Sequence, residues 1–355
     1  MPTLVLNLEI SFIIGIFLAA VTHIWFFRNN SLSDNFLSSI TAIALSAIIG
    51  ITASTLFFWN DDDFVHDISK TQYLVPLFGC LPILFCAYFF NIYYTCALTA
   101  IVTAFDVYFT GINFDFWFNA PDWLNTALTI LSLWGFTCGF YCISALNSFP
   151  QTQALTISVG IIALAAFHCA PVILGCSAAT LTGIFLISYI RCTKQPINHI
   201  AAPVLGYIIA WLGIFTYPEY LLPCFLIFSM YYLAEVILAI LRKLTTISEY
   251  CNITANTSLY QAFSSGAPKP VLSRTIITTD ILLIILGLFQ ISSPNAFSIP
   301  IFAALFCIWQ QYKIIYWQTP HRSFTEINRE IASNLKKSYN ELLKKSDNHT
   351  PEDDK

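Results

Sequence analysis

The stretch TQYLVPLFGCLPILFCAYFFNIYYTCALTAIVTAF, residues 71–105, has no charged side chain in its 35 residues. A helix needs about 17–25 apolar residues to cross a bilayer core of roughly 30 Å. The stretch is therefore long for one membrane-spanning helix and short for two, and only Asn91 suggests a turn. It predicts a membrane protein and leaves open whether these residues form one span or two.

Uncharged runs of similar length recur along the chain. Of its 355 residues, 57% are hydrophobic and 10% are charged, and the mean hydropathy is +0.68. A soluble domain has about 45–50% apolar residues, and lipid offers the backbone no hydrogen-bond partner, which favours helices. The sequence predicts an all-α, polytopic integral membrane bundle of ten or eleven transmembrane helices without a cleavable signal peptide. The candidate spans are residues 4–26, 36–59, 73–90, 91–108, 123–146, 154–168, 170–190, 200–216, 220–241, 275–291 and 297–317.

Basic residues near the helix ends predict which loops face the cytoplasm. They occur in segments 191–194, 242–274 and 322–345. Placing these segments on the cytoplasmic side of the membrane puts the turn 147–153 on the cytoplasmic side too and the aromatic, acidic loop 106–122 on the outside. We expect a transmembrane domain over residues 1–317 and a cytoplasmic, amphipathic and charged tail over residues 318–355. Nucleic-acid binding is not expected, because no basic patch with interleaved aromatic residues occurs.

An acidic run stands out in the segment FWNDDDFVHDISK, residues 58–70. Mg²⁺ usually binds through one or two protein carboxylates together with substrate phosphates. Asp61, Asp62 and Asp63 are therefore candidate metal ligands. The alternative is a solvated helix exit that has no site chemistry. The 11 cysteines form no C-x-x-C pair and indicate small core residues rather than a metal site.

Four later stretches follow the acidic run in a recognisable order. They are LWGFTCGFYCISALNSFPQTQAL from Leu133, VILGCSAATLTGIFL from Val172, YYLAEVILAILRKL from Tyr231 and ITANTSLYQAFSSGAPKPVLSR from Ile253. The collinear set resembles the polyprenyl-phosphate N-acetylhexosamine-1-phosphate transferases, membrane glycosyltransferase family 4, and within them the O-antigen-initiating branch. The resemblance covers residues 36–290 and makes residues 1–317 a transferase-like domain.

That family transfers a HexNAc-1-phosphate from a UDP-sugar to polyprenyl phosphate in cell-envelope glycan synthesis, with Mg²⁺ as cofactor. The resemblance implies that Asp62 and Asp63 are catalytic and that Mg²⁺ binds to Asp61, Asp62 and Asp63. It also implies substrate binding by a second set of residues, Asn147, Glu235, Tyr260 and Gln261. Expected partners are a membrane lipid such as polyprenyl phosphate, a UDP-sugar, and either a second copy of the chain or other envelope-glycan enzymes.

The chain departs from the family at several motif positions. Pro150 and Gln153 stand where the family has aspartates, Cys176 replaces another acid, and Ala255 and Ser258 replace loop histidines. Neutral Cys is a poor ligand for Mg²⁺. We therefore expect weak or absent transferase turnover. The alternatives are a catalytically inactive protein that binds a lipid or forms a complex, and, third, a transporter.

Two further acids lie within apolar runs. Glu235 stands about two helical turns before Arg242, and Asp280 stands near the start of another span. An ionisable side chain at membrane depth usually faces a partner or a cavity. Glu235 therefore either binds substrate, as the resemblance implies, or pairs with Arg242. Asp280 likewise either belongs to a site or pairs with another side chain.

Overall fold

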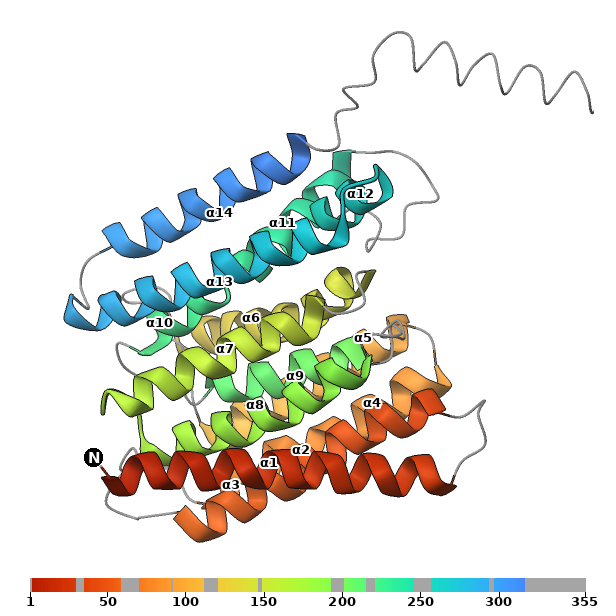
Figure 1. Ribbon diagram of the computed structural model, residues 1–355, viewed down its shortest axis with the longest axis vertical. Coiled ribbons are helices and arrows are strands. Elements are labelled where there is room, and N and C mark those ends of the chain that lie inside the picture. Colours follow the sequence, from red (N-terminus) through yellow and green to blue (C-terminus); the bar gives the residue numbers. More distant parts are fainter. Residues whose placement is uncertain are drawn as a thin grey trace, which may run out of the picture.

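The computed structural model describes residues 2–29, 35–58, 70–90, 92–111, 121–145, 149–192, 201–214, 221–245, 257–293 and 297–316, and within these ranges it contains helices and no strand. The long helices run in one general direction (Figure 1). The predicted all-α class is confirmed. The elements are α1 Pro2–Asn29, α2 Asn35–Phe58, α3 Lys70–Leu74, η1 Val75–Gly79, α4 Cys80–Phe89, α5 Ile92–Thr110, α6 Asp122–Cys142, η2 Ile143–Ala145, α7 Phe149–Ala166, α8 Val172–Cys192, α9 Ala201–Ile214, α10 Leu221–Phe228, α11 Met230–Thr245, α12 Ser258–Ser264, α13 Lys269–Ser292 and α14 Ser298–Tyr316.

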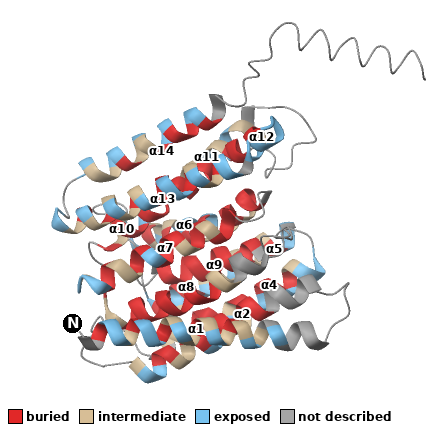
Figure 2. Ribbon diagram, viewed as in Figure 1, coloured by how far each residue is buried: buried red, intermediate tan, exposed pale blue. Residues whose placement is uncertain are grey.

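The outer faces of these helices are apolar. Large hydrophobic side chains such as Phe17, Tyr108 and Phe289 are more than half exposed, while several polar side chains, among them Glu235 and Gln153, are fully buried. Exposed and buried residues alternate around the outer helices in Figure 2. This distribution suits a bundle surrounded by lipid, because hydrocarbon solvates apolar side chains and polar groups must find partners inside.

Four described helices are long and apolar enough to cross a membrane: Leu4–Thr22, Gln72–Phe89, Phe149–Ala166 and Pro270–Ser292. The pair Leu221–Phe228 and Met230–Arg242, bent by 60°, gives a fifth span if it crosses as one unit. Shorter apolar helices cover Ala42–Phe58, Val172–Ile187 and Ala202–Gly213. A multi-pass membrane protein is confirmed, while the total of ten or eleven spans stays a prediction.

The uncharged stretch 71–105 divides at the expected turn. α4 ends at Phe89 and α5 begins at Ile92. The indole N–H of Trp134 donates to the carbonyl oxygen of Cys96 at 2.8 Å, which attaches α5 to α6. Residues 71–105 therefore form two apolar segments rather than one long span.

α1, α2 and α8 pack as one group at the edge of the bundle. A methyl group on Gly15 of α1 would overlap the backbone of Thr180 in α8, and a Cβ on Gly183 would lie 2.7 Å from the carbonyl oxygen of Phe12. The hydroxyl groups of Ser54 and Thr180 lie 2.8 Å apart, which links α2 to the same contact. Small residues permit this close approach, as they do in many membrane bundles.

One end of the bundle, the Leu4 end, is formed by the starts of α1 and α8 and the end of α2. Leu4 lies in one apolar cluster with Phe58, Ile162 and Val172. Ile162 lies near the end of α7, whereas Phe149 starts that helix. The two residues are 13 positions apart, which spans about 20 Å at the helical rise of about 1.5 Å per residue. The label N marks the Leu4 end of α1 in Figure 1.

The opposite end, the Gln261 end, holds α12 and the start of α7. The rings of Phe149 and Tyr231 lie 5.9 Å apart between centroids, and Arg242 donates to Gln261 at 3.0 Å. α8 and α11 end on this side, α13 begins here, and α12 contacts α14. The helix ends next to the basic segments at 191–194 and 242–274 therefore lie at the same end of the bundle.

Candidate functional site

Three predicted substrate-binding residues lie together at the Gln261 end. Glu235 stands on α11, and Tyr260 and Gln261 stand on α12, which packs against α11. The structure thus brings together two motifs that the resemblance treats as parts of one site. The other predicted site residues lie outside the described residues: Asp61, Asp62, Asp63 and Asn147.

Glu235 is fully buried and faces the start of α12. Its Oε2 accepts a hydrogen bond from the backbone N–H of Ser258 at 3.0 Å. The Oγ1 of Thr257, the N-cap residue, accepts from the N–H of Tyr260 at 3.3 Å. The first N–H groups of a helix have no partner within the helix. Glu235 and Thr257 supply two such partners, so the acid stabilises the position of α12.

Arg242 and Gln261 form the second link between these helices. The Nη1 of Arg242 donates to the Oε1 of Gln261 at 3.0 Å. Arg242 also interacts electrostatically with Glu235 across two turns of α11. The side chain of Tyr260 is 37% exposed. The interpretation of Glu235 as a partner of Arg242 stays a prediction.

The described residues that flank the acidic run lie at the Leu4 end of the bundle. Phe58, the last residue of α2, belongs to the cluster at the Leu4 end. On the other side of the run, the hydroxyl of Tyr73 donates to Ser177 in the second turn of α8 at 2.8 Å. The described residues on both sides of the acidic run therefore lie at the other end of the bundle from Glu235, while the run itself lies outside the described residues.

A second buried acid, Asp280 on α13, contacts α7. The Nε2 of Gln153 donates to both carboxylate oxygens, at 3.2 Å to Oδ1 and 3.0 Å to Oδ2. The hydroxyl of Thr156 donates to Oδ2 at 2.9 Å. Gln153 is the residue that stands where the family has an aspartate. The sequence singled out both positions, but it did not predict that the two side chains form hydrogen bonds with each other.

Tyr231 is a third buried polar group in this region. It stands four residues before Glu235, one turn away on α11, and its ring is fully buried. Both Glu235 and Asp280 act on it electrostatically. Its hydroxyl has no hydrogen-bond partner among the described residues.

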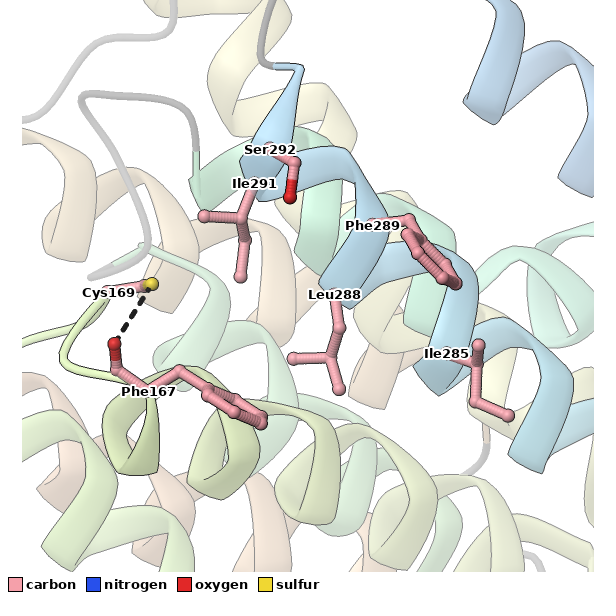
Figure 3. Close-up of a pocket in the computed structure, with 7 residues that line it drawn as sticks. All are labelled: Phe167, Cys169, Ile285, Leu288, Phe289, Ile291 and Ser292. Atoms are coloured by element: carbon pink, nitrogen blue, oxygen red, sulfur yellow. Dashed lines mark hydrogen bonds between the residues drawn. The ribbon is translucent and has the colours of Figure 1, made fainter.

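A lateral cavity of about 490 Å³ lies between the ends of α7 and α13, toward the Leu4 end. Figure 3 shows Leu288 and Ile291 of α13 directed toward Phe167 and Cys169. The thiol of Cys169 donates to the carbonyl oxygen of Phe167 at 3.3 Å. Ser292 adds one hydroxyl group, and the remaining lining residues are apolar. The cavity therefore suits hydrocarbon better than a sugar nucleotide.

No metal site is formed by the helices that the structure describes: within them, no group of three or more His, Cys, Asp or Glu side chains can hold an ion. Cys176, which stands where the resemblance implies an acid, is buried with Leu4 and Leu8. The described residues therefore do not fit Mg²⁺, and Mg²⁺ binding stays a prediction that depends on Asp61, Asp62 and Asp63.

Comparisons with known proteins assign no family to this arrangement. No protein-family model matches the chain, and no curated protein matches it.

Proposed function

We propose that the chain is a transferase-like protein of the cytoplasmic membrane that binds a membrane lipid and has weak or no sugar-1-phosphate transferase turnover. In the reaction that the resemblance implies, a HexNAc-1-phosphate would pass from a UDP-sugar to polyprenyl phosphate. The proposal combines the collinear motifs of the sequence with the packing of the described helices.

The observation that carries the proposal is the engagement of Glu235 by the chain itself. A catalytic or substrate-binding carboxyl group must be free to meet substrate or metal at the moment of reaction. Glu235 instead accepts from the N–H of Ser258, and Gln261 accepts from Arg242. Both groups support α12, and a substrate that used them would have to displace these bonds.

Lipid binding is supported by the lateral cavity at α7 and α13. Phe167 and Phe289 on its rim are more than 60% exposed. In a bilayer these residues contact hydrocarbon, so the cavity is accessible to an acyl or polyprenyl chain without passage through water. A second copy of the chain and other envelope-glycan enzymes remain proposed partners.

The orientation of the proposal follows the basic segments. The ends of α8 and α11 and the start of α13 lie together at the Gln261 end. Cytoplasmic loops carry an excess of Lys and Arg. We therefore place the Gln261 end and the C-terminus in the cytoplasm and the Leu4 end outside.

One preparation tests both parts of the proposal. Purified protein is incubated with a panel of UDP-N-acetylhexosamines, undecaprenyl phosphate and Mg²⁺, and UMP release is measured. Lipids retained by the same preparation are identified by native mass spectrometry. We expect retained lipid and little or no UMP, whereas rapid UMP release would contradict the proposal.

A matched pair of variants assigns the retained lipid to the cavity. Leu288→Trp fills the cavity between α7 and α13, and Ile281→Trp places the same ring on the exposed face of the same helix. We expect lipid retention to fall in Leu288→Trp and to persist in Ile281→Trp. Equal retention in both variants would place the lipid elsewhere.

A transporter is the second candidate, and the bend between α10 and α11 favours it. The two helices meet at Ser229 with an angle of 60°, and the buried residues Tyr231 and Glu235 follow within the first two turns of α11. Interrupted helices with polar groups at membrane depth form the binding sites of many transporters. Substrate-dependent ion flux in proteoliposomes would favour this function over lipid binding.

A further inference from the structure

Asp280 is an acid without a nearby cation in the part of the bundle that the structure describes. It is 3% exposed and lies within the span Pro270–Ser292. α7 offers it two neutral donors, Gln153 and Thr156. The titratable groups that face it from the other packed helices are Tyr231 of α11 and Cys307 of α14, and neither carries a positive charge.

An ionised carboxyl group at this depth is costly because hydrocarbon and packed side chains solvate charge poorly. Two neutral hydrogen-bond donors offset part of the cost but leave the net charge in place. Glu235 differs, since Arg242 on the same helix acts on it electrostatically. The two acids therefore occupy different electrostatic settings.

We propose that Asp280 is a proton-binding site inside the bundle, with Gln153 as the group that accommodates its two states. In the ionised state both carboxylate oxygens accept the hydrogen bonds observed here. Proton binding converts the carboxylate and a hydronium ion into a carboxylic acid and water. The new O–H then needs an acceptor.

One acceptor lies at hand. The Oε1 of Gln153 is buried and has no partner among the described residues, while the Nε2 of the same amide contacts Asp280. Rotation of the Gln153 amide by half a turn exchanges its donor for its acceptor. Gln153 can therefore receive the proton of the acid without any movement of the backbone.

This proposal does not depend on lipid binding in the lateral cavity.

Infrared difference spectroscopy of protein reconstituted in lipid tests the site directly. We expect the carbonyl-stretch band of a protonated carboxylic acid in the wild type and its loss as the pH is raised. Asp280→Asn should remove that pH-dependent band, and Glu235→Gln should keep it. Persistence of the band in Asp280→Asn, or the absence of any pH-dependent acid band in the wild type, would overturn the proposal.

A second variant keeps the test decisive if Asp280→Asn does not fold. Asp280→Glu retains the acid on a side chain one methylene longer, which changes its hydrogen bonds to Gln153 and Thr156. The band should then shift in frequency rather than disappear. An unchanged band in Asp280→Glu would show that the signal comes from another group and would overturn the proposal equally.

Discussion

The carboxyl group of Glu235 and the backbone N–H of Ser258 meet at 3.0 Å across 23 residues of sequence. This bond attaches the seven-residue helix α12 to the long helix α11. Isolated helices of this length are unstable in water, so α12 depends on such contacts for its position. The acid that the resemblance assigns to substrate binding thus has a structural task.

Loss of the acceptor at Glu235 should loosen α12. Glu235→Leu leaves the N–H of Ser258 buried without its partner, and we expect a cost of about 1–3 kcal/mol in the free energy of unfolding. Glu235→Gln retains an amide oxygen and should cost less. Thermal unfolding in detergent measures the difference, and equal stability of the two variants would contradict the assigned role.

The contact of α1 with α8 should not tolerate a larger side chain at Gly15. A side chain there would overlap the backbone of Thr180, whereas Gly135 on α6 has open space around its Cβ position. Overpacking of a close contact typically costs about 1–3 kcal/mol. We expect Gly15→Leu to lower the unfolding temperature and Gly135→Leu, the matched control, to leave it nearly unchanged.

The two ends of the bundle should face opposite sides of the membrane. A tag inserted within residues 59–69 should be accessible from outside the cell, because Phe58 and Tyr73 both lie on helix segments that pack at the Leu4 end. A reporter fused after Lys355 should be active in the cytoplasm. Labelling of both positions from the same side would refute the predicted orientation.

The acidic run remains the place to test residual transferase chemistry. If slow UMP release is detected, we expect Asp62→Asn combined with Asp63→Asn to abolish it, because removal of one preorganised electrostatic group typically costs about 10²–10³ in rate. Release that survives the double substitution would point to a site elsewhere in the chain. The single variants serve to show which aspartate matters.

The sequence predicted the helical class well because the physical cause is local. Runs without charge identify helices in lipid. Asn91 suggested a turn, but the sequence left open whether residues 71–105 form one span or two, and the structure divides them into α4 and α5. The bend at Ser229 was harder to predict, since no single residue type requires it. The charge rule also placed the loop 106–122 and the turn 147–153 on opposite sides, which agrees with the positions of the flanking helix ends.

The polar contacts were much harder to predict. Gln153 and Asp280 are separated by 127 residues, and their partnership depends on how α7 and α13 pack. The sequence also could not predict at which end of the bundle the helices that flank the acidic run meet, because that depends on how many spans precede them. Glu235 was found because a charge within an apolar helix is conspicuous in the sequence itself.

Any occupancy of the lateral cavity beside Leu288 is governed by concentration within the membrane. A hydrocarbon chain that enters between α7 and α13 arrives from within the plane of the membrane. Its relevant concentration is therefore a mole fraction of the surrounding lipid, not a molarity in the aqueous phase. Dilution of the sample with buffer leaves that fraction constant, whereas added detergent lowers it and empties the cavity by competition.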